Sequence, residues 1–149
     1  MKLPFVPRGP RGLFLLAFVA VVVLALVVVR YAPFYLPPPA ETALPLPDGA
    51  QAVFGYATLT NPLVRLVVVG RPVPSEPARL EGWRREGRDL VADPDAAVDG
   101  RLFTVDPAGL QRLDRFEETD LRYERFLVLL DDDREAWVYR LLPLPPELP

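Results

Sequence analysis

The stretch Val53-Phe54-Gly55-Tyr56-Ala57-Thr58-Leu59 predicts a strand that runs directly into a tight turn. A second stretch, Leu113-Asp114-Arg115-Phe116-Glu117, predicts the end of a helix that delivers a carboxylate. The two stretches together indicate a cradle of backbone amides and a general base. This combination would form a small catalytic site.

The remaining composition narrows the chemistry that such a site can perform. The 149-residue chain has no His and no Cys, one Lys (Lys2) and one Ser (Ser75). His-assisted nucleophiles, imidazole bases and the usual zinc sites are therefore excluded. The acidic run 131–133 lacks the alternating ligands of a calcium loop, so we expect a hairpin turn there. We expect no cofactor and no metal.

Charge is distributed unevenly along the chain. Residues 1–49 are net positive, whereas the remainder is acidic, within a formal total of −3. A mildly acidic domain without a basic stripe is not expected to bind nucleic acid. The absence of Cys removes disulfides from consideration but does not indicate a compartment.

The N-terminal part of the chain has the pattern of a membrane segment. Leu13 to Val29 is a run of 17 residues without a polar side chain. As a helix it would span about 26 Å, slightly less than the hydrocarbon core of about 30 Å. Lys2, Arg8 and Arg11 precede the run and Arg30 follows it, which predicts a cytoplasmic N-terminus and a domain on the periplasmic or extracellular side.

A cleaved signal peptide is the main alternative to an uncleaved anchor. Signal peptides have a shorter apolar region, followed by a cleavage site with small residues. The bulky residues 27–31 do not match such a site, so the pattern favours a single-pass anchor over residues 13–32.

Composition divides the rest of the chain into four parts. Residues 1–12 are expected to be a cytoplasmic segment, and residues 33–50 form a linker that holds six prolines between positions 33 and 47. The linker is either a semi-rigid polyproline II spacer or a disordered tether. Residues 51–142 are expected to form the domain, and the proline-rich tail 143–149 is expected to be irregular.

The domain shows many short strand patterns and two helix patterns. We expect strands at 51–56, 78–84, 87–92, 97–105, 123–130 and 135–142, a loop at 71–77, and a helix from Asp106 to Glu117. Asn61-Pro62 predicts a helix start and Gly70 a stop, although the β-branched residues between them favour a strand. We expect a short helix there. The fold class is therefore α+β, a small mixed β-barrel with short flanking helices.

Four segments in order resemble the gamma-glutamylcyclotransferase-like family over about residues 51–141. They are residues 54–59, 98–105, 113–117 and 123–125. The resemblance implies that the backbone of Tyr56, Ala57, Thr58 and Leu59 holds the gamma-glutamyl part of a small-molecule substrate. It also implies that Glu117 is the catalytic base and that Tyr123 lines the pocket.

The chemistry implied by the resemblance suits these residue types. The α-amine of a gamma-glutamyl compound attacks its own γ-carbonyl and forms a five-membered lactam, so no Ser or Cys nucleophile is needed. One Glu can carry the proton from the amine to the leaving nitrogen, and turn amides can stabilise the oxyanion. Burial beside Phe116 and Tyr123 would raise the pKa of Glu117 toward the useful range.

Two positions depart from the family pattern. Ala57 stands where the family usually has Gly, so a left-handed backbone there would be strained. Glu118 stands where Gly often follows the catalytic Glu, and its carboxylate either raises the pKa of Glu117 or faces water.

Two functions follow: an enzyme that releases 5-oxoproline, or an inactive member that binds a ligand or protein partner at the membrane. The sequence indicates no oligomeric state.

Overall fold

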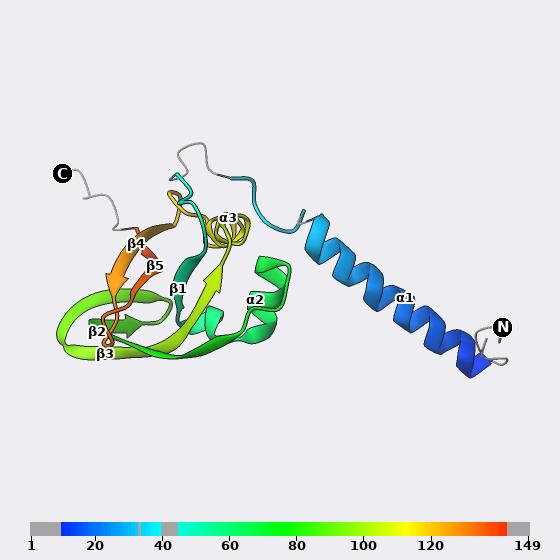
Figure 1. Ribbon diagram of the computed structural model, residues 1–149, viewed down its shortest axis with the longest axis horizontal. Helices are drawn as coiled ribbons and strands as arrows, with labels where there is room; N and C mark the ends of the chain where they lie inside the picture. Colours follow the sequence, from blue (N-terminus) through cyan, green and yellow to red (C-terminus); the bar gives the residue numbers. More distant parts are fainter. Residues whose placement is uncertain (1–9, 33, 40–44, 143–149) are drawn as a thin grey trace, which may run out of the picture. The chain divides into compact units, whose positions relative to one another are not determined.

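The computed structural model describes residues 10–32, 34–39 and 45–142 (Figure 1). The chain divides into two units, with the boundary between Pro33 and Phe34. Most of the expected cytoplasmic segment 1–12, including Lys2 and Arg8, lies outside the described residues. The expected tail 143–149 and linker residues 33 and 40–44 also lie outside them.

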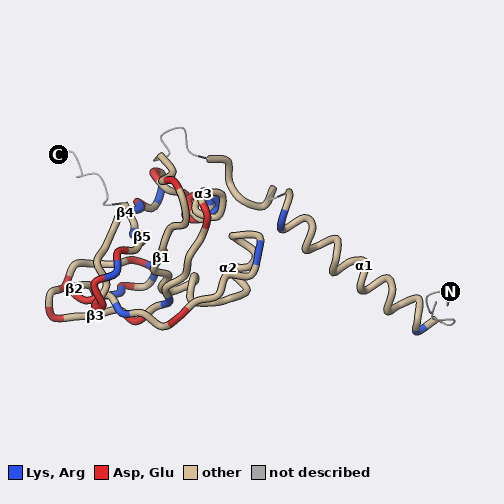
Figure 2. Tube along the Cα trace, in the orientation of Figure 1, with Lys and Arg blue, Asp and Glu red and all other residues tan. Residues whose placement is uncertain are grey.

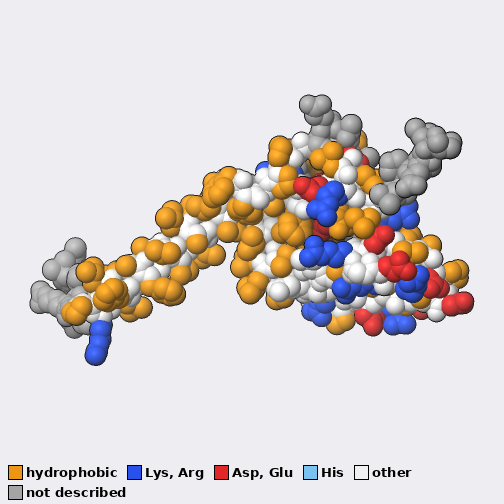
Figure 3. Space-filling view, turned by 180° about the vertical axis from the view of Figure 1, so that it is seen from behind, with side chains coloured by type: hydrophobic (Ala, Val, Ile, Leu, Met, Phe, Trp, Pro, Cys, Tyr) orange, Lys and Arg blue, Asp and Glu red, His pale blue; other side chains and the backbone are white. Residues whose placement is uncertain are grey.

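The described residues of the first unit form helix α1 (Pro10–Tyr31), in which no residue is buried. It is long and apolar enough to cross a membrane, by length and composition. Charged residues occur only near its two ends (Figure 2), and hydrophobic side chains cover its visible surface (Figure 3). Its bounds include most of the expected anchor, residues 13–32.

The second unit is built on one five-stranded sheet. Its strands are β1 (Gln51–Gly55), β2 (Ser75–Glu86), β3 (Asp89–Val105), β4 (Tyr123–Leu129) and β5 (Glu135–Leu141). The order across the sheet is β2-β3-β1-β5-β4. The β1–β5 pair is parallel, with Val53 opposite Trp137, and the other pairs are antiparallel. The predicted α+β class with a mixed sheet and short helices is confirmed.

Helix α2 (Pro62–Val69) forms where the sequence signals conflict. The Asn61 side chain accepts a hydrogen bond from the Leu63 N–H at 2.9 Å, and Gly70 ends the helix with φ of 79°. These caps, together with burial of Val68 and Val69, outweigh the β preference of the branched residues. The predicted short helix is therefore present.

Helix α3 (Pro107–Phe116) follows β3 without a loop. The Asp106 side chain accepts a hydrogen bond from the Gly109 N–H at 2.8 Å, as expected for an N-cap. Leu110 and Leu113 are fully buried, so the helical spacing of apolar residues faces the sheet.

Strands β2 and β3 are longer than predicted. Strand β2 begins at Ser75, inside the expected loop 71–77, and β3 continues through the predicted break at Pro94. The pairing shifts register there, because Glu81 lies opposite Ala97 whereas Trp83 lies opposite Ala92. Pro94 thus falls where the ladder is interrupted, and its missing N–H removes no ladder bond.

The sheet curls until its β4–β5 end meets strand β2. The Asp131 N–H donates to the Arg79 carbonyl at 3.3 Å, and Arg134 forms an ion pair with Glu76. Asp131 and Arg134 belong to the β4–β5 turn, and 131–133 is the hairpin turn that the sequence predicts.

The central strand β1 contributes to two apolar clusters, one on each face of the sheet. Val53 belongs to the cluster that includes residues of α2 and α3, whereas Phe54 belongs to the cluster on the other face. Both side chains are at most 1% exposed. This alternation fixes the register of β1, because a shift by one residue would exchange its two faces.

The described parts of the proline-rich linker pack against the domain. Leu36 is buried, and the Arg115 guanidinium donates to the carbonyls of Leu36 and Pro37 at 3.0 Å and 2.5 Å. The Tyr35 hydroxyl donates to the Val67 carbonyl at 2.8 Å. These residues therefore form part of the folded unit and do not act as a free-standing spacer.

Gly100 provides a test of the close packing between β3 and β1. A Cβ atom at Gly100 would lie 2.5 Å from Cζ of Phe54 and 2.7 Å from the Gly55 carbonyl oxygen. Gly100→Ala should therefore lower the free energy of unfolding by about 1–3 kcal/mol, measured by urea denaturation. Asp99→Ala, at the neighbouring exposed position, should lower it by less than about 1 kcal/mol. Equal effects of the two substitutions would contradict this packing.

Candidate active site

The turn after β1 forms one wall of the candidate site. It is a short 3₁₀ helix, η1 (Ala57–Thr60), in which Ala57 has a left-handed φ of 47°. Its hydrogen bonds begin with the Leu59 N–H, which donates to the Tyr56 carbonyl at 3.1 Å. The preceding N–H groups of Ala57 and Thr58 are thus left out of the turn's own hydrogen bonds. The turn has the left-handed conformation that Gly would favour, although Ala57 stands at that position.

A buried arginine of α2 closes the far end of this turn. Arg65 is 3% exposed, and its Nη1 donates to the carbonyls of Leu59 and Thr60 at 2.8 Å and 2.9 Å. Its Nη2 donates to the Ser75 hydroxyl at 2.8 Å. Arg65 therefore fixes the turn from behind, on the side away from the N–H groups of Ala57 and Thr58.

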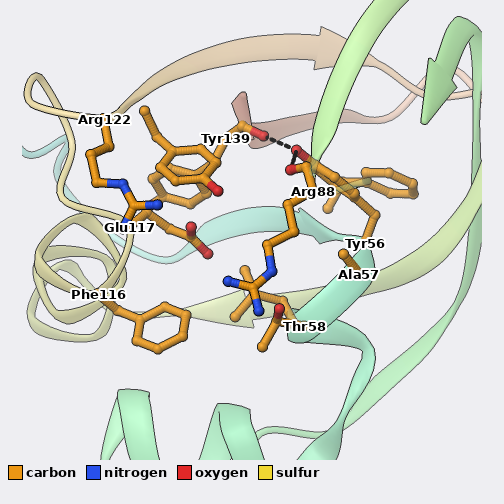
Figure 4. A pocket seen from close by; sticks show the side chains of 11 residues that line it. Tyr56, Ala57, Thr58, Arg88, Phe116, Glu117, Arg122 and Tyr139 are labelled. Atoms are coloured by element: carbon orange, nitrogen blue, oxygen red, sulfur yellow. Dashed lines mark hydrogen bonds between the residues drawn. The ribbon is translucent and has the colours of Figure 1, made fainter. Parts of the chain in front are cut away.

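Glu117 caps the C-terminal end of α3 and points into the cavity in Figure 4. Burial raises the pKa of Glu117 to about 7, and the nearby Arg122 and Arg88 cations oppose this rise. Within the described ranges, no N–H or O–H group donates to its carboxylate. A carboxylate in this state can accept a proton from a ligand near neutral pH.

The residue after Glu117 turns the chain away from the cavity. Glu118 has a left-handed φ of 50°, and its side chain pairs with Arg122 at 3.2 Å. Its carboxylate is not among the charges that shift the pKa of Glu117. Glu118 belongs to a partly exposed ion pair, which favours the alternative in which its carboxylate faces water.

A buried polar network connects α3 to the sheet beneath the cavity. Asp114 accepts hydrogen bonds from Arg125 Nη1 at 2.6 Å and from the Tyr139 hydroxyl at 2.8 Å. The Tyr56 hydroxyl in turn donates to the Tyr139 carbonyl at 2.6 Å. Burial raises the pKa of Tyr56, so its phenol remains a donor at neutral pH. Because Asp114 lies one helical turn before Glu117, the network orients the end of α3.

These elements enclose a cavity of about 340 Å³, a volume suited to a small metabolite. It is lined by Phe54, Tyr56, Ala57, Thr58, Leu59, Arg88, Phe116, Glu117, Arg122, Tyr123 and Tyr139. All six residues singled out from the sequence are in this set. The backbone cradle of residues 56–59 and the Glu117 carboxylate thus face the same cavity, as residues 53–59 and 113–117 of the sequence predict.

Five lining residues were not named as site residues from the sequence, although Phe116 was expected beside Glu117. Phe54, Phe116 and Tyr139 supply apolar walls, whereas Arg88 and Arg122 supply positive charge. Arg122 lies close enough to Glu117 along the chain to have been considered. Nothing in the sequence connects Arg88 with Glu117, because it comes from the turn between β2 and β3. In the described part of the chain, no group of three or more His, Cys, Asp or Glu side chains could hold a metal ion.

Comparisons with known proteins identify the family and the fold. A protein-family model described as gamma-glutamyl cyclotransferase, AIG2-like, matches residues 53–148. Comparison with curated protein sequences gave no match. The solution structure of At3g28950.1 from Arabidopsis thaliana superposes with a TM-score of 0.54 and 25% identity, and the match covers 66% of each chain.

Two further structures share the fold. The solution structure of At5g39720.1 from Arabidopsis thaliana has a TM-score of 0.53 and 22% identity, with 72% of this chain and 77% of that chain covered. A structure described as gamma-glutamyl cyclotransferase has a TM-score of 0.54 and 13% identity, with 63% of this chain and 68% of that chain covered.

The raised pKa of Glu117 predicts a pH-dependent cost to stability. The folded protein keeps a proton on Glu117 up to about pH 7, whereas in the unfolded chain Glu117 has its ordinary pKa of 4.5, so the contribution of Glu117 to stability falls as pH rises between these values. Glu117→Gln should match the wild type below pH 4.5 and be more stable by up to about 3 kcal/mol above pH 7. Thermal and urea unfolding at several pH values would measure the difference. A difference that does not change with pH would contradict the burial of an ionisable Glu117.

Proposed function

Because the chain belongs to the gamma-glutamyl cyclotransferase, AIG2-like family, we propose that it releases 5-oxoproline from a gamma-glutamyl amine or peptide. The observation that carries this proposal is the position of Glu117. Its carboxylate accepts no hydrogen bond from the described residues, has a pKa of about 7, and shares one cavity with the Ala57–Leu59 turn.

The proton transfers of the proposed reaction need one carboxylate. Glu117 removes a proton from the substrate's α-amine, whose nitrogen then attacks the γ-carbonyl carbon. The resulting tetrahedral intermediate collapses as the bond to the leaving nitrogen breaks, and Glu117 returns the proton to that nitrogen. The products are 5-oxoproline and the free amine. A base with a pKa near 7 suits both the acceptance and the return of the proton.

The turn after β1 serves the developing oxyanion in this proposal. The N–H groups of Ala57 and Thr58 are not used by the turn's own hydrogen bonds, so they can donate to the oxygen of the γ-carbonyl. Tyr123 and Phe116 form walls that keep the substrate's amine close to its carbonyl. Arg65 holds the turn rigid through the carbonyls behind it.

The alternative function, an inactive family member that binds a ligand or protein partner, depends on Ala57 and Glu118. Both residues adopt the left-handed backbone conformation that Gly would take there, and the Glu118 side chain pairs with Arg122. Ala57 therefore keeps the left-handed turn, and Glu118 is not among the residues that line the cavity. No observation favours the inactive alternative, which becomes an outcome of the activity test.

We also propose that α1 is an uncleaved membrane anchor. Its apolar side chains are exposed along its whole length, and no residue of it is buried in the protein. The excess of basic residues before the apolar run supports a cytoplasmic N-terminus and a domain on the periplasmic or extracellular side.

The activity test uses the purified full chain and a panel of gamma-glutamyl amines, amino acids and peptides. Glu117→Gln should reduce kcat/KM by about 10²–10⁴-fold, because it removes the general base. For the wild type, kcat/KM should rise with pH up to about 7, since only the ionised form of Glu117 accepts a proton. Release of 5-oxoproline is the measured quantity.

Glu118→Gln is the matched control, because it removes the adjacent carboxylate, whose side chain is paired with Arg122. It should keep kcat/KM within a few-fold of the wild type. Failure of the wild type to release 5-oxoproline from every compound, or equal activity of the Glu117→Gln variant, would refute the enzymatic proposal and favour the inactive alternative.

The topology can be tested with single cysteines, because the natural chain has none. Asp48→Cys should react in intact cells with a maleimide that cannot cross the membrane, whereas Lys2→Cys should react only after permeabilisation. A mature protein that begins beyond residue 32 in its N-terminal sequence would show a cleaved signal peptide and refute the anchor.

A further inference from the structure

The turn between β2 and β3 brings a cation to a site that is distant from it in sequence. Glu86 and Asp89 are paired across the two strands, so Gly87 and Arg88 form the connection. In Figure 4 the Arg88 side chain extends into the cavity, with its guanidinium near Thr58 and on the side facing Glu117.

The backbone that carries Arg88 is held from several directions. The Tyr56 hydroxyl, whose proton points mainly to the Tyr139 carbonyl at 2.6 Å, shares it with the Arg88 carbonyl at 3.1 Å, and the Arg85 Nε donates to the Gly87 carbonyl at 2.7 Å. The Asp89 carboxylate accepts from the N–H groups of Leu90 and Leu141 at 2.8 Å and 2.9 Å. The hairpin tip is therefore tied to the end of β1 and to β5, and Arg88 is presented from a fixed base.

The guanidinium itself has no partner among residues 10–32, 34–39 and 45–142. No carboxylate or carbonyl there accepts a hydrogen bond from it. Arg122, the other cation of the cavity, is already paired with Glu118 at 3.2 Å. Arg88 is exposed at the edge of a cavity that suits a small metabolite, and a planar guanidinium without a protein partner there is complementary to a carboxylate that binds through both oxygens.

We infer that Arg88 binds a carboxylate of the substrate and thereby selects gamma-glutamyl compounds that carry it in the right place. The inference rests on the proposed function for the identity of the substrate. Two carboxylates qualify: the α-carboxylate of the gamma-glutamyl group, and the carboxylate of the leaving group when this is an amino acid or peptide. In both cases the substrate's α-amine faces Glu117 while its carboxylate faces Arg88.

The test compares three compounds. The first is a gamma-glutamyl amino acid. In the second its leaving-group carboxylate is replaced by a carboxamide, and in the third its α-carboxylate is replaced by a carboxamide. Arg88→Met should reduce kcat/KM for the first compound by about 10–100-fold, mainly through KM, because it removes a charge-assisted hydrogen bond. The wild type and variant should act equally on the compound that lacks the carboxylate bound by Arg88. The carboxamide compound on which wild type and Arg88→Met have equal kcat/KM identifies the carboxylate that Arg88 binds. Equal losses on all three compounds would overturn the inference.

Matched variants separate recognition from charge and from folding. Arg79→Met removes an exposed cation of β2 that pairs with Asp99 at 3.0 Å, outside the residues that line the cavity, and it should leave all three kcat/KM values unchanged. Arg88→Lys should recover part of the lost activity. Rates are compared at a pH where each variant has reached its plateau, because Arg88 also lowers the pKa of Glu117.

Binding measurements distinguish failure of this inference from failure of the proposed function. Calorimetry with the full chain carrying Glu117→Gln gives the Kd of each compound without turnover. Tighter binding to this variant than to the Glu117→Gln/Arg88→Met double variant would support the inference even if the wild type proved inactive. Equal Kd values, or no binding of any compound, would overturn it even if the wild type released 5-oxoproline.

Discussion

One buried ion pair, between Asp114 of α3 and Arg125 of β4, connects the elements that surround the cavity. The Arg125 side chain is 1% exposed, and the same Asp114 carboxylate receives the Tyr139 hydroxyl from β5. Tyr139 continues the network to β1 through its carbonyl and the Tyr56 hydroxyl. A buried ion pair is a weak source of net stability, but removing one partner would leave an unpaired charge at a cost of about 3–5 kcal/mol. The pair therefore specifies how α3 sits on the sheet, and with it where Glu117 points.

Strain and desolvation are concentrated around the same cavity. Ala57 and Glu118 both have left-handed backbones, which cost L-residues other than Gly roughly 1–2 kcal/mol each. Glu117 lies between these two turns with a carboxylate that burial makes harder to ionise. Packing elsewhere, in the two clusters on either face of β1, compensates for these costs. Backbone strain of this kind is typical of functional sites.

The sequence allowed correct predictions where the signals were local. The strand and turn at 51–59, the capped helix at 106–117 and the hairpin around 131–133 each depend on residues close together in the chain. The extent of β2 and β3 was missed, because Pro77 and Pro94 normally interrupt a ladder, and only the curled sheet shows that Pro94 falls at a register shift. Arg88 was missed for a related reason: it reaches Glu117 only because a long hairpin folds back over the end of β1. The family resemblance supplied Tyr123, but no local pattern could have supplied Tyr139.

The irregular edge strand β2 also has a consequence for the behaviour of many copies together. Pro77 offers no N–H for pairing, the ladder shifts near Gly82, and the Arg79 carbonyl is already occupied by Asp131. An edge interrupted in this way is a poor template for a strand from another molecule. Confinement to a surface would raise the local concentration of such domains far above that in dilute solution, and a regular edge would then promote aggregation. The prolines that complicate the prediction of β2 thus help to keep neighbouring copies apart.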